Sequence, residues 1–140
     1  MSLPKELLLE IVTPDRLMLR EAVDEVELPG AEGYLGILPG HTPLLATLKV
    51  GEMWYRKGTQ KFYVLMAFGF AEVLPDRVTV LAQIAEKADE IDVKRAEAAL
   101  QRAQARLAKP TSDMDFERAR IALLKSISRL QVAARARIHS

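Results

Sequence analysis

Positively charged side chains at helical spacing are the residues of this chain with the clearest capacity for chemistry. Arg95 and Arg102 are seven residues apart, so they would share one face of a helix. An antiparallel partner helix would bring Lys125 and Arg129 close to them. Four cations on a folded hairpin repel one another unless an anion lies among them. A polyphosphate would meet that need through charge-assisted, partly bidentate contacts.

Polar and small residues near these cations could complete a ligand site. Asp92 could accept hydrogen bonds from a base or a ribose, Ala96 leaves space, and Glu86 lies shortly before them in the chain. The same residues fit a simpler interpretation, in which the cations form a solvated basic face and Asp92 is an ordinary helix N-cap. The residues alone leave both interpretations open.

Residue types needed for catalysis are scarce. The chain has no cysteine, and its two histidines, His41 and His139, are far apart, so no transition-metal site is expected. A serine–histidine–aspartate site would have to use His41, but the serines lie in the first residues or in the second half of the chain. His41 is expected to cap a turn or to meet a partner. We therefore predict a protein that is not an enzyme.

Arginines in the second half could also neutralise the phosphates of a nucleic acid. However, Phe116 is the only aromatic residue among them, and it lies on an apolar stripe. The pattern does not resemble a helix that reads bases. We expect no nucleic-acid partner, and a protein surface rich in carboxylates fits these cations better.

Amphipathic periodicity predicts that the second half is helical. One apolar stripe contains Val93, Ala96, Leu100, Ala103 and Leu107, and the other contains Phe116, Ala119, Leu123, Ile127, Leu130 and Ala134. Pro110 ends the first helix, and Ser112 followed by Asp115 predicts a capping box for the second. The short connection implies an antiparallel hairpin, and its alanine-rich seam should be weak.

Short apolar runs separated by turn residues predict that the first half is a β-sandwich or barrel. The expected strands cover residues 7–12, 23–28, 44–50, 61–70, 71–74 and 78–84. Segment 28–45 holds four of the seven glycines and three of the seven prolines, which is typical of tight turns between strands. A phosphate-cradling loop is not expected there, because the glycines do not stand between a strand and a helix and no Lys-Ser or Lys-Thr pair follows them.

Charge divides the chain at the same place as the change of pattern. Residues 1–90 contain nine lysines and arginines against fourteen carboxylates, whereas residues 91–140 contain eleven against five. This asymmetry indicates two units with different partners. We predict a mainly-β-then-α fold of the α+β class, with a sandwich at 1–86, a joint at 87–90 and a helical unit at 91–140.

The glycine- and proline-rich segment also carries a family resemblance. The pattern LPGxEGxxGILPGHxPLL, from Leu28 to Leu45, resembles the signature of the ε subunit of bacterial F-type ATP synthases, which corresponds to the mitochondrial δ subunit. The resemblance extends over essentially the whole chain, through the Val12-Thr13-Pro14 opening, residues 69–73 and 78–82, and the paired Arg-Ala sequences at 95–96 and 118–119.

The resemblance implies a non-catalytic rotor subunit that helps to couple proton flow to ATP synthesis. It implies a ten-stranded N-terminal β-sandwich that docks on the γ subunit and rests on the c ring, and a C-terminal two-helix hairpin. Glu32, Tyr34 and Leu35 would then lie toward the c ring, and His41 toward γ. Tyr34 is a departure, because many relatives have a carboxylate at this position.

In this family the hairpin can leave the sandwich and extend along γ into the catalytic hexamer, where it blocks rotation during ATP hydrolysis. Its basic residues would then meet acidic segments of the catalytic β subunits. The segment from Ile91 to Ala96, which includes Asp92 and Arg95, matches the I/L-D-x-x-R-A motif that binds ATP in some members.

Further nucleotide contacts of that group are matched by Glu86, Arg102 and Arg129, whereas Lys125 stands where the strongest binders have arginine. No cofactor is required under this resemblance, and regulatory ATP is the expected small molecule.

The resemblance also implies a peripheral location at the cytoplasmic face of the bacterial inner membrane, with membrane contact only through the complex. No leader sequence is expected, since residues 1–12 lack both a basic start and a long apolar run. The alternative from another functional class is a stand-alone anion-binding or scaffold module that uses its basic helices.

Overall fold

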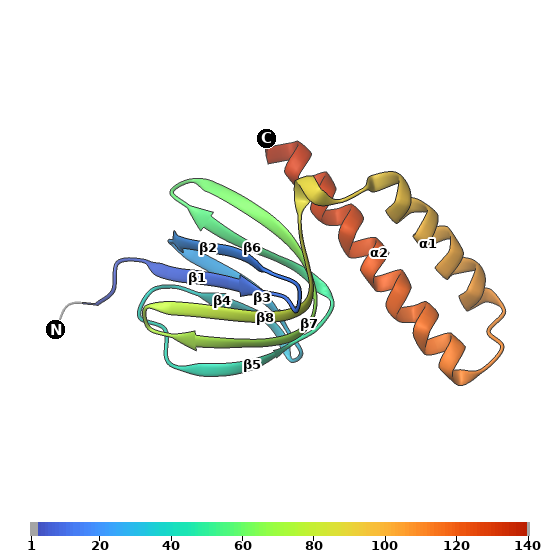
Figure 1. Ribbon diagram of the computed structural model, residues 1–140, viewed down its shortest axis with the longest axis horizontal. Coiled ribbons are helices and arrows are strands. Elements are labelled where there is room, and N and C mark those ends of the chain that lie inside the picture. Colours follow the sequence, from blue (N-terminus) through green and yellow to red (C-terminus); the bar gives the residue numbers. More distant parts are fainter. Residues whose placement is uncertain (1–2, 140) are drawn as a thin grey trace.

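The chain folds into a β-sandwich followed by two helices (Figure 1). The computed structural model describes residues 3–139, and the side chains of residues 3–136. The strands are β1 (Leu7–Val12), β2 (Leu17–Val23), β3 (Glu25–Gly30), β4 (Gly33–Ile37), β5 (Leu44–Leu48), β6 (Gly51–Lys57), β7 (Gln60–Leu74) and β8 (Arg77–Lys87). A 3-10 turn, η1 (Ala88–Glu90), leads to α1 (Val93–Ala108) and α2 (Asp113–His139).

All eight described strands belong to one hydrogen-bonded sheet with the order β2-β1-β8-β7-β5-β3-β4, and β6 pairs with β3 and β7. Every pairing is antiparallel except that of β1 with β8. The sheet curls over on itself and encloses one core (Figure 1). Alternate residues of β1 point into this core, so Leu7, Leu9 and Ile11 are fully buried.

The strand count differs from the ten that the family resemblance implies. The separate strands expected at 61–70 and 71–74 are one continuous strand, β7. β7 and β8 pass together through a bend at Phe68 and Gly69; Ala67 pairs with Ile84 before it and Gly69 with Ala82 after it, in the same register. Ladder hydrogen bonds resume beyond the bend, so no strand ends there. The strand expected at 23–28 corresponds to β3, which begins at Glu25, because Val23 ends β2 and Asp24 lies between the two strands.

Gly69 makes this bend possible. Its φ is +148°, and a Cβ atom at this position would lie 1.9 Å from the carbonyl oxygen of Leu81 on β8. Phe68 has a φ of 56°, a conformation that a bulky residue rarely adopts. A residue in this conformation persists only where the surrounding structure imposes it. The bend is therefore a specified feature of the sandwich.

The helices form the expected antiparallel hairpin, with caps at the expected residues. The side chain of Asp92 accepts a hydrogen bond from the Arg95 amide at 3.1 Å, and the Ser112 hydroxyl accepts one from the Asp115 amide at 3.0 Å. The Asp115 side chain in turn accepts from the Thr111 amide. Both helix starts thus have partners for amides that the helix itself cannot satisfy.

The buried face of α2 differs from the expected stripe. Ala119 is buried as expected, but Ser126 and Ala133, which were not expected, are buried too, whereas Phe116 and Ile127 are exposed. The small side chain of Ala119 lies beside Ala103 of α1, where it lets the two helices approach closely. The Ser126 hydroxyl donates to the carbonyl of Ala122, so its burial leaves no polar group unsatisfied.

The second half of α2 docks the hairpin on the sandwich, and α1 lies on the outer side of α2 (Figure 1). A small apolar cluster of Leu65 on β7, Ile91, Val132 and Ala133 forms the buried contact, which we call the docking cluster. Two ion pairs flank it, Arg129 with Glu86 and Arg135 with Glu52. The hairpin is thus held by a contact much smaller than the sandwich core.

Candidate functional site

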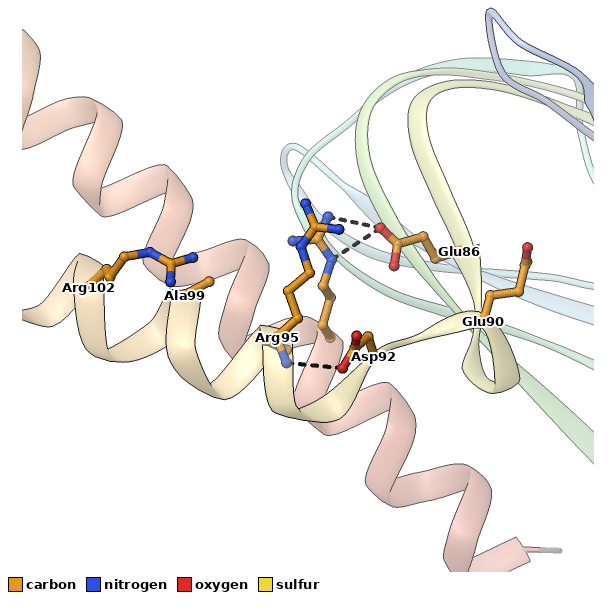
Figure 2. A pocket seen from close by; sticks show the side chains of 8 residues that line it. Glu86, Glu90, Asp92, Arg95, Ala99 and Arg102 are labelled. Carbon is orange, nitrogen blue, oxygen red and sulfur yellow. Dashed lines mark hydrogen bonds and ion pairs between the residues drawn. The ribbon is translucent and has the colours of Figure 1, made fainter.

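A cavity of about 470 Å³ lies where β8, η1, α1 and α2 meet (Figure 2). We call it the junction pocket. Its walls are Glu86, Glu90, Asp92, Arg95, Ala96, Ala99, Arg102 and Arg129. The residues come from the sandwich, from the joint and from both helices, so the complete pocket exists only while the hairpin is docked.

Local structure positions the acidic side of the junction pocket. Glu86 lies one residue before the end of β8, and Asp92 is the N-cap of α1. Glu90 accepts a hydrogen bond from the Lys87 amide at 3.0 Å and pairs with Arg16 at 2.7 Å. The hydrogen bond from Arg16 lowers the pKa of the Glu90 carboxyl, so this group is ionised at neutral pH.

The cations of the pocket differ in their partners. Arg129 donates from Nε and Nη2 to Oε1 of Glu86, at 3.1 and 2.8 Å, and both side chains are about three-quarters buried. Arg95 and Arg102 have no carboxylate partner among the described residues. Figure 2 shows Arg95 extending toward Glu86, with Arg102 further along α1. The wall residues include three carboxylates and three guanidinium groups, and the two guanidinium groups without a carboxylate partner could donate charge-assisted hydrogen bonds to an anion.

Most residues proposed from the sequence as nucleotide contacts line this one pocket. They are Glu86, Asp92, Arg95, Ala96, Arg102 and Arg129. Ile91 lies elsewhere, because its side chain packs in the docking cluster. Lys125 does not line the pocket either; its ammonium group lies 5.9 Å from the ring centre of Phe68. It lines an adjoining hollow that shares Ala99 and Arg129 with the junction pocket.

The sequence interpretation missed two residues of the pocket wall. Ala99 lies three residues after Ala96 and three before Arg102, so helical spacing alone could have placed it on this face. Glu90 follows Lys87 by three residues, and its side chain returns to the Lys87 amide as in a capping box. The pairing of Glu90 with Arg16, which is 74 residues away, could not be predicted from the neighbouring residues in the sequence.

The residues expected at subunit interfaces lie on the sandwich, away from the junction pocket. Glu32 is exposed in the turn between β3 and β4, Tyr34 is half exposed on β4, and Leu35 packs against the core. Partial burial and the charge of Glu52 raise the pKa of the Tyr34 hydroxyl. His41 lies with Nδ1 2.7 Å from the carbonyl oxygen of Thr42, an arrangement that fits a turn.

No group of three or more potential metal ligands lies together among residues 3–136, whose side chains the structure describes. No helix in the same range combines the length and the apolar character needed to cross a membrane.

Comparisons with known proteins agree with the two-part architecture. Residues 6–88 match the family model of the β-sandwich domain of the ATP synthase delta/epsilon chain. Residues 89–134 match that of its long α-helix domain. The ATP synthase epsilon chain 2 of Syntrophotalea carbinolica is 49% identical over 132 residues, which cover 94% of this chain and 96% of that protein. The epsilon chain of Syntrophobacter fumaroxidans is 53% identical over 125 residues, covering 89% and 93%.

A solved structure supports the fold. A chain in the mitochondrial ATP synthase of Euglena gracilis, from a structure of its OSCP, F1 and c-ring parts, superposes with a TM-score of 0.82 at 24% identity. The match covers 99% of this chain and 85% of that one. On the two family models and these relatives, the chain belongs to the delta/epsilon chain family of ATP synthase.

Proposed function

We propose that this chain is a non-catalytic subunit of the central stalk of an F-type ATP synthase. The match of both halves to the delta/epsilon family, over residues 6–134, is the observation that carries the proposal. The related chains in solved structures come from complexes described as containing a c ring or a central stalk. The subunit would be peripheral, at the cytoplasmic face of the bacterial inner membrane, and would meet the membrane only through the complex.

The sandwich, residues 1–86, would grip γ and rest on the c ring. Its surface exposes large apolar side chains, among them Leu38, Leu45, Phe70 and Leu81. Exposed apolar groups on a small domain are typical of a surface that a partner covers. Glu32, Tyr34 and Leu35 would face the ring, and His41 would face γ. Without a carboxylate at Tyr34, the ring contact there would be aromatic rather than charged.

The hairpin, residues 91–140, would be the mobile brake on ATP hydrolysis, with residues 87–90 as its joint. The docking cluster has four buried residues and is flanked by two ion pairs, so modest free energies would be enough to detach it. Once extended along γ, the basic helices would face acidic segments of the catalytic β subunits, where opposite charges favour association and register.

ATP would bind in the junction pocket and hold the hairpin down. Asp92 and Glu86 could accept hydrogen bonds from the base and ribose, and Arg95, Arg102 and Arg129 would meet the phosphates. Because sandwich, joint and helices all contribute walls, such a ligand would bind the docked form only. A ligand shifts an equilibrium by its differential affinity, so abundant ATP would favour the docked form.

Two experiments test the proposal. The tagged full chain, expressed in place of the resident subunit, should co-purify from membranes with γ and the catalytic subunits. The alternative of a stand-alone anion-binding or scaffold module predicts no such recovery. Truncation after Ala88 should preserve binding to γ and raise ATP hydrolysis by the assembled enzyme. Unchanged hydrolysis would refute the brake while leaving the stalk assignment intact.

Calorimetric titration of the full chain with ATP tests the regulatory ligand separately. We expect heat of binding that is lost in Arg95→Gln, since this guanidinium has no other partner in the pocket. No heat at millimolar ATP would remove the regulatory role and leave the stalk subunit unaffected.

A further inference from the structure

Two further hollows adjoin the junction pocket along the seam between α1 and α2. One adjoining hollow shares Ala99 and Arg129 with it and adds Arg118 and Lys125 to the wall. A second hollow shares Ala99 and Arg102 with it, and Arg118 lines both hollows. Because the three spaces have wall residues in common, they lie next to one another along the seam, and we call them together the seam groove.

Charge is distributed unevenly along the seam groove. The acidic residues in its walls, Glu86, Glu90 and Asp92, all lie at the junction end. Every charged residue that lines the two adjoining hollows is a cation. Arg102 and Arg118 have no carboxylate partner among the described residues. The groove therefore runs from an end that can accept hydrogen bonds to a stretch that carries uncompensated positive charge.

The dimensions of this stretch suit a long, thin anion. Ala103 and Ala119 lie at its floor and are buried, so guanidinium groups extend past a surface of methyl groups. From Arg95 to Arg106 the groove follows eleven residues of α1, which is about 16 Å of helix. Arg106 closes the far end, where it pairs with Asp115 at 2.8 Å.

We propose that the seam groove binds a linear polyphosphate chain longer than a triphosphate, with Arg102 and Arg118 holding its distal phosphates. The proposal deepens the proposed function, because the nucleoside end of ATP would occupy the junction pocket and its phosphates would enter the same groove. A guanidinium group donates two parallel hydrogen bonds to phosphate oxygens. A phosphate chain carries a charge at every unit and needs no side-chain pockets, which matches a floor of alanine.

Arg118 and Arg120 provide a matched pair of variants for the test. They are two residues apart on α2 and thus point to different sides of the helix. Arg120 pairs with Glu117 and lines none of the three hollows. Arg118→Gln and Arg120→Gln remove the same charge from exposed positions, so non-specific attraction would change equally in both.

The full chain and both variants are titrated calorimetrically at low ionic strength without divalent cations, first with a short-chain linear inorganic polyphosphate and then with ATP. We expect polyphosphate to bind, Arg118→Gln to weaken it about tenfold, and Arg120→Gln to weaken it less than about twofold. The loss of ATP affinity in Arg118→Gln should be smaller than the loss of polyphosphate affinity.

Absence of polyphosphate binding overturns the inference, as does an equal loss in the two variants. An oligoglutamate peptide of the same charge that binds as tightly as polyphosphate also overturns it, because the groove would then be a site for acidic segments. Binding of ATP without polyphosphate removes this inference and keeps the proposed ATP role. Polyphosphate binding that depends on Arg118, without ATP binding, supports this inference and removes the proposed ATP role.

Discussion

Val132 offers the sharpest test of the docked hairpin. Its side chain is fully buried between α2 and the sandwich, where it packs in the docking cluster with Leu65 and Ile91. Val132→Ala removes two buried carbon groups at about 0.8 kcal/mol each. The cavity that remains adds to this cost, so we expect a loss of about 2 kcal/mol. The ratio of docked to undocked hairpin would then fall about 30-fold.

Hydrogen exchange read by mass spectrometry resolves where this loss is felt. The alanine-rich hairpin should unfold once it is undocked, so in Val132→Ala the amides of α1 and α2 should exchange about 30-fold faster, whereas amides of β1 and β8 should be unchanged. The docking cluster is separate from the sandwich core, which explains the difference. Met114→Ala is the control, because Met114 is on the same helix but largely exposed, and its effect should stay within about 0.5 kcal/mol.

The opposite pattern would refute this reasoning. If strands and helices of Val132→Ala exchange faster by the same factor, then the hairpin and the sandwich unfold as one cooperative unit. A brake that detaches by itself would then be excluded for the isolated chain.

Three further predictions concern the sandwich and the joint. Gly69→Ala should lower the free energy of unfolding in urea by several kcal/mol, because its Cβ would overlap a carbonyl oxygen of β8. Gly36→Ala, which meets no atom within 4 Å, should change it by less than about 1 kcal/mol. The pKa of the Glu90 carboxyl is lower in the folded chain than in the unfolded chain, where it is about 4.3. Its pairing with Arg16 therefore stabilises the folded chain fully when the pH is above the unfolded pKa, and this stabilisation is lost as the pH falls through the folded pKa. The stability difference between the wild type and Arg16→Gln, measured by urea unfolding from neutral to acidic pH, should therefore disappear at the acidic end; a difference that persists would contradict the pairing. Burial raises the pKa of Tyr55 to about 12, so folding stability should fall between about pH 10 and 12, and Tyr55→Phe should lack this loss. Ultraviolet titration of the tyrosines, compared between wild type and Tyr55→Phe, checks the value directly.

Local signals account for the parts of the architecture that were predicted correctly. Pro110 ends α1 and Ser112 starts α2, because a proline and an N-cap act on their immediate neighbours. Asp92 likewise caps α1, as the simpler of its two interpretations required. The second oxygen of the Asp92 carboxylate stays available to a ligand in the junction pocket.

Features that depend on distant contacts were not predicted. β7 continues through its bend because β8 pairs with it on both sides of Gly69, and the residues on β7 alone suggest a break. Ser126 is buried on the face of α2 that meets α1, whereas Val132 lies on another face of α2 and packs against the sandwich. The spacing of apolar residues shows that a helix has a buried face, but it does not show whether a given residue packs against the other helix or against the sandwich.

The sequence by itself determined a sandwich with glycine-rich turns, two capped helices and the spacing of the cations on α1. Each of these follows from preferences of the backbone within a few residues. The tertiary structure alone decided that Glu90 joins those cations in one pocket and that Lys125 lies over Phe68 instead. The reason is physical: residues 43 and 74 positions apart, Arg129 with Glu86 and Arg16 with Glu90, meet only when the core of the sandwich and the docking cluster have formed.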